Sequence, residues 1–349
     1  PAGNTDQGSF SAMELTRPRA AFSTVLRGLA PGRRTRIVLT VLAAVLLLVA
    51  AVGFGAHFWT ARHSWTLGVV AFSPYPMLAA PVGALILAVA RQWIGLVVAL
   101  VIVGLCASTQ IRLYVAATPA ANAHSLVTMT ANLHLGEADP SAVVKAVRTH
   151  AVDVLMLEEL TEGEQTRLIA AGLNDALPFH ASDPRYSATG TGLWSRYPLA
   201  DVKLRTDFTF AFVTATVRIP GVATEPTVAA LHLAGPVPST TFWQRDIARL
   251  PSVLRELAAR GIVIVGGDFN ATPDVTQFRR LLVDGYRDAA QQAGAGMTRT
   301  YPSDRWYPPF IAIDHVLTRA AVGTSADTIE IGNSDHRALL VTVAVPRAA

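Results

Sequence analysis

The chain has 349 residues, of which 51% are hydrophobic and 15% charged, and its mean hydropathy of +0.36 excludes an ordinary soluble enzyme. Residues 1–115 hold 9 of the 29 Lys and Arg side chains and 2 of the 25 Asp and Glu side chains, so residues 116–349 carry 20 basic and 23 acidic ones. The pI near 9.5 is therefore not the footprint of a nucleic-acid-binding domain.

Three long apolar segments follow the N-terminal residues 1–36, at Ile37–Trp59, about 65–90 and about 94–115. Each is long enough to cross a hydrocarbon core of about 30 Å. Three prolines in the second segment predict a kinked or broken helix. The only cysteine, Cys106, lies in the third segment, so the remainder of the chain cannot use disulfide bonds. Residues 37–115 are thus expected to form three transmembrane helices.

Charge predicts the orientation of these helices. Six arginines precede the first apolar segment: Arg17, Arg19, Arg27, Arg33, Arg34 and Arg36. By the positive-inside rule the N-terminus is cytoplasmic, and three crossings place the chain beyond residue 115 outside the membrane. A signal peptide is the alternative for the first segment, but two more apolar segments follow without a clear cleavage site, which favours retained helices.

A Pro- and Ala-containing linker is expected at residues 116–124, and strands and helices alternate over residues 125–346. Strands are expected near 126–132, 153–158, 190–195, 208–219, 226–231, 262–266, 311–317 and 338–345. Helices are expected at about 140–150, 161–175 and 239–260. Two packed mixed sheets flanked by helices would fit this order.

Polar side chains gather where these strands end. Asp268 and Asn270 follow the apolar run Ile262–Val265 and, being two residues apart, point to the same face. Glycines before them allow another group to approach the backbone closely. Taken alone, this pair is equally compatible with an Asx turn that opens the next helix. Similar polar positions occur at five other strand ends: Asn132, Glu158-Glu159, His232, Asp314 and Asp335-His336.

In this order the motifs N…DVLMLEEL…GTGLWSRYPL…LHLAGP…GGDFN…IDHVL…SDHRAL resemble the endonuclease/exonuclease/phosphatase superfamily, over about residues 125–345. That superfamily includes DNases, abasic-site endonucleases, neutral sphingomyelinases and inositol-polyphosphate phosphatases. The resemblance implies a four-layer α/β sandwich of two packed mixed β-sheets, here preceded by the three transmembrane helices. It also implies phosphoester hydrolysis with Mg²⁺, or with Mn²⁺ as the alternative ion.

The resemblance also implies a metal site. Glu159 aligns with the Glu of the family's QE motif and is the expected ligand, because carboxylate oxygens suit a hard cation. Asn132 and Asp335 are expected beside the metal. Glu158 should point away from the site by strand alternation. His134 stands where some members have an acidic ligand, and a ligand or a surface residue is equally compatible with its position.

The same resemblance implies the catalytic roles. Asp268 would orient or deprotonate the attacking water, and Asn270 would hold a phosphate oxygen. His336 would donate to the phosphate, with Asp314 accepting from its other ring nitrogen and fixing the tautomer. His232 resembles the second catalytic histidine of the DNase-like and sphingomyelinase-like branches.

The expected function is that of a membrane-anchored, metal-dependent phosphoester hydrolase acting outside the cytoplasmic membrane. Its substrate would be a phosphodiester in nucleic acid or a phospholipid head group, and no protein partner is evident. Aromatic residues among the prolines of segment 301–310 would dip into the membrane interface, stack on a base or simply pack the loop down. A non-catalytic membrane module is the alternative of another class, and the complete set of site residues argues against it.

Overall fold

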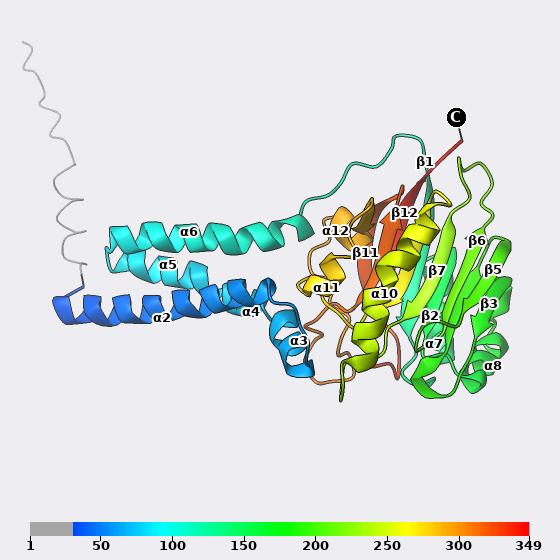
Figure 1. Ribbon diagram of the computed structural model, residues 1–349, viewed down its shortest axis with the longest axis horizontal. Coiled ribbons are helices and arrows are strands. Elements are labelled where there is room, and N and C mark those ends of the chain that lie inside the picture. Colours follow the sequence, from blue (N-terminus) through cyan, green and yellow to red (C-terminus); the bar gives the residue numbers. More distant parts are fainter. Residues whose placement is uncertain (1–30, 349) are drawn as a thin grey trace, which may run out of the picture.

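The computed structural model describes residues 31–348, in which a helical stalk projects from one side of an α/β domain (Figure 1). The stalk consists of α2 (Arg33–His57), α5 (Ala79–Val89) and α6 (Trp93–Gln110). Two short helices, α3 (Ser64–Ala71) and α4 (Pro74–Met77), lie between α2 and α5, where the stalk meets the domain. Of the six arginines used to orient the chain, Arg17, Arg19 and Arg27 lie outside the described residues.

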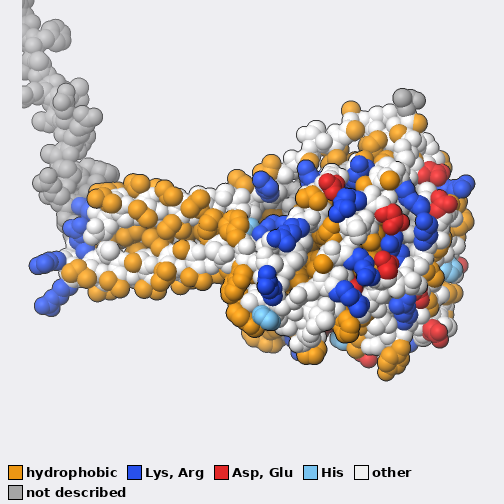
Figure 2. Space-filling view, viewed as in Figure 1, with side chains coloured by type: hydrophobic (Ala, Val, Ile, Leu, Met, Phe, Trp, Pro, Cys, Tyr) orange, Lys and Arg blue, Asp and Glu red, His pale blue; other side chains and the backbone are white. Residues whose placement is uncertain are grey.

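The stalk is apolar over its outer surface, with Lys and Arg gathered at its far end (Figure 2). Three segments are long and apolar enough to cross a membrane, namely Arg33–His57, Ser64–Val89 and Trp93–Leu113. Within the most apolar 18-residue stretch of each segment, only 17%, 39% and 11% of the residues, respectively, are buried within the protein. The middle segment is the most buried because it is broken into α3, α4 and α5, as its prolines predict.

Small residues allow the stalk helices to approach closely. A side chain at Gly53 of α2 would place its Cβ 2.8 Å from the carbonyl oxygen of Ser73. Ala43 and Ala50 of α2 are fully buried against α5 and α6, together with Ala99 of α6. Such small-residue contacts are the usual means by which helices pack in a membrane, where apolar side chains gain nothing by leaving lipid.

The α/β domain contains two six-stranded mixed sheets. In the first sheet the order is β11 (Val322–Glu330), β12 (Arg337–Pro346), β1 (Ala123–Asn132), β2 (Val154–Glu158), β4 (Thr191–Ser195) and β3 (Phe179–Asp183). In the second it is β5 (Leu199–Arg205), β6 (Phe212–Val217), β7 (Thr227–His232), β8 (Val263–Asp268), β10 (Asp314–Arg319) and β9 (Tyr286–Asp288). The helices are α7 (Pro140–Thr149), α8 (Glu162–Ala170), α9 (Leu173–Ala176), α10 (Thr241–Ala258), α11 (Thr276–Arg279) and α12 (Ala289–Gln292).

Alternating side chains divide the core into layers. Met156 of β2 and Ile264 of β8 point into the apolar layer between the sheets. Their neighbour Leu155 faces the core under α7, and Val265 faces the core under α10. Because both faces of the central strands are covered, the sequences of these strands are continuous apolar runs. The four-layer α/β sandwich expected from the sequence is therefore confirmed.

Strand direction brings the polar strand ends to one edge of the sandwich. β1 runs parallel to β2, and β7 runs parallel to β8, so their carboxyl ends lie together. β12 and β10 run antiparallel to them, which brings their amino ends to the same edge. In the second sheet Asp268 is the direct cross-strand partner of both His232 and Asp314.

The segment that follows Asn270 is bonded to the stalk. Asp274 Oδ1 lies 2.8 Å from His57 Nδ1 at the end of α2 and accepts a hydrogen bond of 2.8 Å from Gln110 Nε2 at the end of α6. Arg279 donates to the carbonyl oxygen of His57 at 2.7 Å. The side chains of His57 and Asp274 are both buried. The ends of α2 and α6 are thus hydrogen-bonded to the loop that follows Asn270.

The aromatic segment 301–310 also packs at this junction. The Phe310 ring lies 5.3 Å from the Phe72 ring, and the Tyr75 hydroxyl donates to the Phe310 carbonyl oxygen. Tyr301 turns toward the site, with its ring 4.8 Å from that of His336. Trp306 is 95% exposed. Most of this segment therefore packs against the protein, and only its tip is free to meet another surface.

We predict that Asp274→Ala lowers the free energy of unfolding by about 1–3 kcal/mol, because buried His57 and Gln110 lose their common partner. The midpoint of thermal unfolding of the full chain in detergent measures this loss. The control is Glu225→Ala, which removes an exposed carboxylate from a loop of the same domain. An equal midpoint for the two variants would show that the Asp274 contacts do not hold the junction.

Candidate active site

Asp268 is the centre of the polar cluster. Its Oδ1 accepts a hydrogen bond of 2.7 Å from the backbone N–H of Asn270. Around its Oδ2 lie Asn132 Nδ2 at 3.3 Å, Asn270 Nδ2 at 3.3 Å, His232 Nε2 at 3.5 Å and His336 Nε2 at 3.8 Å. The carboxylate is almost fully buried. Burial would raise its pKa, but the two histidines outweigh this and hold the pKa of Asp268 below its ordinary value.

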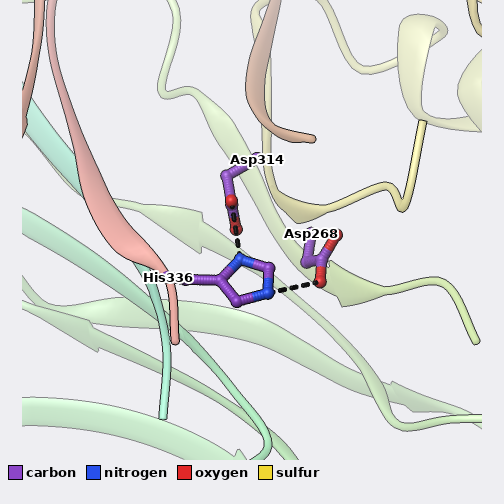
Figure 3. A group of neighbouring side chains, drawn as sticks. All are labelled: Asp268, Asp314 and His336. Carbon is purple, nitrogen blue, oxygen red and sulfur yellow. Dashed lines mark hydrogen bonds and ion pairs between the residues drawn. The ribbon is translucent and has the colours of Figure 1, made fainter. Parts of the chain in front are cut away.

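His336 lies between two carboxylates (Figure 3). Its Nδ1 is 2.9 Å from Asp314 Oδ2, and its Nε2 faces Asp268. Burial lowers its pKa, but the charges of Asp314 and Asp268 and the hydrogen bond to Asp314 raise the pKa of His336 to about 10. The imidazole is therefore cationic at neutral pH and donates from both ring nitrogens.

His232 occupies the other side of Asp268. Its Nδ1 donates to the carbonyl oxygen of Ala188 at 3.1 Å, which directs Nε2 toward Asp268 and Asn270. Phe210 covers the ring, at 4.9 Å between centroids. Burial lowers the pKa of His232, whereas Asp268 and Glu159 raise it, and the net pKa lies above the ordinary value.

Glu159 and Asn132 form the part of the site that best suits a divalent cation. Asn132 Nδ2 lies 3.1 Å from Glu159 Oε1 and 3.3 Å from Asp268 Oδ2, so its amide joins the two carboxylates. Asp335 lies nearby, and burial together with the negative charge of Glu159 raises its pKa, which a cation would reverse. His134 Nδ1 is 3.1 Å from Asp335 Oδ1.

A second arrangement of possible ligand atoms is the group Asp268, Asp314 and His336, whose ligand atoms lie within 4.8 Å of one another. This group could hold a metal ion by spacing alone. However, His336 would have to lose its proton to become a ligand, and the two carboxylates oppose that loss. Glu159 and Asp335 offer carboxylate oxygens, the donors that Mg²⁺ and Mn²⁺ prefer, and need no histidine to lose its proton.

Glu158 points away from the site and into the protein. It is fully buried, accepts a hydrogen bond of 2.7 Å from Thr130 Oγ1, and leaves its second oxygen without a partner in the described structure. Burial raises the pKa of Glu158 well above its ordinary value, and the nearby charges of Asp314 and Asp268 add to the shift. Burial therefore favours the neutral form of Glu158, whereas Glu159 faces the solvent-accessible side.

Three turn residues of the site adopt left-handed backbone conformations, with φ of 46° at His134, 57° at Glu159 and 49° at Asn270. Such φ values are uncommon for residues other than glycine and concentrate at functional sites. The turn at Glu159 ends β2 and separates its side chain from that of Glu158. The backbone of Leu231 lies so close to residue 267 that only glycine fits there, because an added Cβ would lie 1.8 Å from the Leu231 carbonyl oxygen.

Two residues that the sequence analysis did not single out complete the site. Ser334 Oγ accepts from the backbone N–H of His336 at 3.0 Å and donates to the carbonyl oxygen of Asn132 at 2.8 Å, which ties together two site loops. Tyr301 packs on His336. Ser334 precedes Asp335-His336 directly and could have been included in that motif, whereas Tyr301 belongs to the aromatic segment 301–310, whose position just before the Asp314 strand indicates that it lies near the site.

The cluster lies on the floor of a groove of about 730 Å³. Glu159, His232, Asp268, Asn270 and His336 all line it. One wall is the loop 234–239 together with Phe242, and the opposite wall is α3 with Phe72. The structure thus brings residues from the separate strand ends into one groove, and Asn132 and Asp314 contact these residues without lining it. It also adds a wall that comes from the segment between α2 and α5.

The two-sheet sandwich with carboxylates, amides and imidazoles at one edge is a phosphoesterase- and nuclease-like fold. The sequence model of the Endonuclease/Exonuclease/phosphatase family matches residues 129–336, more than half of the chain, and the chain belongs to this family. Members of this family are hydrolases that act on phosphoester bonds. The resemblance seen in the sequence is confirmed.

Solved structures agree in fold. D. rerio TDP2 humanized by 14 mutations has a TM-score of 0.53 and 16% identity, covering 63% of this chain and 98% of its own. The Bacteroides vulgatus endonuclease/exonuclease/phosphatase has a TM-score of 0.53 and 15% identity, covering 64% and 99%. D. rerio TDP2 complexed with single strand DNA product has a TM-score of 0.51 and 16% identity, covering 63% and 98%. No curated protein matches the chain significantly.

The charge of His336 predicts a pH-dependent contribution to stability. Because the folded pKa of about 10 lies above the ordinary value of 6.5, this contribution is complete below pH 6.5 and is lost as pH rises through about 10. In metal-free protein with chelator, the difference in unfolding free energy between wild type and His336→Gln should therefore shrink over that range, by a few kcal/mol. Thermal or urea unfolding at each pH measures it. A difference that stays constant would contradict a cationic His336.

Proposed function

We propose that the protein is a divalent-metal-dependent phosphoester hydrolase that is anchored in the membrane and acts at its extracytoplasmic surface. The proposal rests on one observation. The buried carboxylate of Asp268 is surrounded by two imidazoles and two amides on the floor of an open groove. Hydrolysis of a phosphoester needs an oriented water and positive donors for the phosphate oxygens, and this arrangement supplies both.

In the proposed mechanism Asp268, kept ionised by its neighbours, orients the attacking water and receives its proton. His336 and His232 donate to the phosphate oxygens, and Asn270 fixes one of them. Asp314 holds the His336 ring by its Nδ1. Glu159, with Asn132 and Asp335, would hold Mg²⁺ or Mn²⁺, which neutralises charge on the phosphate when bound.

For the chain as a whole we propose a cytoplasmic segment 1–36, three transmembrane segments within 37–115, a linker 116–124 and a catalytic domain 125–346. The exposed arginines Arg33, Arg34 and Arg36 support this orientation, because they lie at the end of the stalk that is farthest from the domain.

A nucleic-acid phosphodiester and a phospholipid head group are the two candidate substrates. The DNA product in the D. rerio TDP2 structure supports the first for a protein of the same fold. The position of the groove beside the stalk supports the second. A non-catalytic membrane module is a weaker proposal, because binding alone does not require a buried carboxylate with two imidazoles.

Adjacent glutamates offer a matched test of the proposed metal site. Glu159→Gln removes the charge that would bind the cation and should lower kcat/KM for bis(p-nitrophenyl) phosphate with Mg²⁺ by about 10²–10³-fold. Glu158→Gln makes the same change one residue earlier, where the side chain is fully buried and burial favours its neutral form, so activity should stay near that of wild type.

Glu158→Gln should also raise the midpoint of thermal unfolding at pH 7. Because the folded pKa of Glu158 lies above the ordinary value of 4.5, its contribution to stability is complete below pH 4.5 and is lost as pH rises through the folded pKa. Glutamine does not ionise, so the variant avoids this loss at pH 7.

Full activity of Glu159→Gln, or full activity of wild type in excess chelator, would refute the proposed metal site. Equal loss in both variants would assign the effect to folding.

Single cysteines test the orientation. In a Cys106→Ser background, Tyr186→Cys lies on the α/β domain and Thr35→Cys at the far end of the stalk, and both positions are exposed. A membrane-impermeant thiol reagent should label position 186 in intact spheroplasts and position 35 only after permeabilisation. The reverse pattern would place the domain in the cytoplasm.

A further inference from the structure

The groove above the site has a wall that belongs to the membrane-associated part of the chain. Leu67, Gly68 and Ala71 of α3, followed by Phe72, line it opposite Val237 and Phe242. Ser64 Oγ donates to the carbonyl oxygen of Pro236 at 2.6 Å, which joins the two walls at one end. Catalytic floor and membrane-associated wall therefore enclose one continuous space.

The lining suits hydrocarbon and not a polyanion. None of the described residues that line the groove is Lys or Arg, and apolar side chains predominate above the catalytic floor. Proteins that hold a nucleic-acid strand line its path with basic side chains, because phosphate contacts supply most of the affinity. A volume of about 730 Å³ lies within the range of sites that enclose a small amphiphilic ligand.

Exposed apolar side chains mark the level at which the groove meets the bilayer. Trp59 follows α2 and Trp65 lies in α3, and their rings meet edge to face at 5.7 Å. They are 48% and 63% exposed, and Phe242 and Val237 on the opposite wall are 53% and 77% exposed. Tryptophan at the end of a membrane-crossing helix is typical of the lipid–water interface. The groove thus lies beside the end of the stalk that carries these two tryptophans, where we expect the bilayer surface.

We propose that the substrate is a membrane phospholipid, whose phosphoester reaches Asp268 while part of an acyl chain lies along α3. This inference rests on the proposed hydrolase function and assigns its substrate class. Water adds to phosphorus, one P–O ester bond breaks, and the leaving alkoxide takes up a proton, so no further reactant is needed.

A glycine on the groove wall provides the first test. A Cβ at Gly68 would meet no atom within 4 Å, so Gly68→Leu places a side chain in the groove without a clash at the backbone. Gly55→Leu is the matched control, since Gly55 is a helical glycine of α2 with equally open surroundings and lies outside the groove. The full chain in detergent is assayed on mixed micelles of phosphatidylcholine and phosphatidylglycerol, on bis(p-nitrophenyl) phosphate and on a single-stranded oligonucleotide.

We expect wild type and Gly55→Leu to hydrolyse the lipid, and Gly68→Leu to lose at least about tenfold more activity on the lipid than on the small ester, as for loss of a few buried methylenes. Equal losses on both substrates would overturn the groove as a lipid site. Hydrolysis of the small ester or the oligonucleotide without hydrolysis of either lipid would overturn the substrate class and leave the hydrolase function standing. Inactivity on every substrate would instead refute the proposed function.

A second test does not depend on turnover. Asp268→Asn, which should retain lipid uncleaved, is reconstituted as the full chain in nanodiscs with phosphatidylcholine carrying a diazirine in its acyl chain. After illumination, mass spectrometry should find labelled peptides that contain Phe72, Val237 or Phe242, and Gly68→Leu in the same background should lower that labelling severalfold. Labelling confined to α2, α5 and α6 would overturn the proposal even if the enzyme is a hydrolase.

Discussion

The bonding of Asp274 to both His57 and Gln110 is the interaction on which the arrangement of the active site depends. It ties the ends of α2 and α6 to the loop that begins at Asn270, so the chain that leaves α2 must turn beside the catalytic edge. Helix α3 forms where the chain makes that turn. Leu67 and Val70 of α3 pack into the same apolar cluster as Trp243 of α10, so the junction continues into the core of the domain.

The central strands and the order of the polar strand ends could be predicted from the sequence because each central strand is buried on both faces. The strands that were missed, β3, β5, β9 and β11, are the four edges of the two sheets. Exposure removes the apolar run from β3, β5 and β11, and β9 has only three residues. The role of α3 could not be predicted. Its apolar residues indicated a membrane span, whereas α3 lies against the domain and its contacts with the loop 234–239 are long-range.

The adjacent residues Glu158 and Glu159 show how one backbone turn assigns opposite chemistry to identical side chains. The left-handed conformation of Glu159 ends β2 and brings its carboxylate to the Asn132 amide. Glu158 remains within the strand, where burial raises its pKa and the nearby charges of Asp314 and Asp268 add to the shift, so its neutral form is favoured. Strand alternation predicted their opposite directions, but the protonation of Glu158 depends on the second sheet and could not be read from the first strand alone.

Anchoring changes what the groove must supply. An enzyme held at the bilayer surface meets phospholipid at a high effective concentration, so little affinity is needed to keep the site occupied. If the substrate is the proposed phospholipid, apolar contacts with α3 would orient its phosphoester toward Asp268, which is the part of binding that accelerates a reaction. A soluble relative must obtain that orientation from its own loops. In the proposed reaction the segment between α2 and α5 would provide it, because its helix α3 lines the groove beside Asp268.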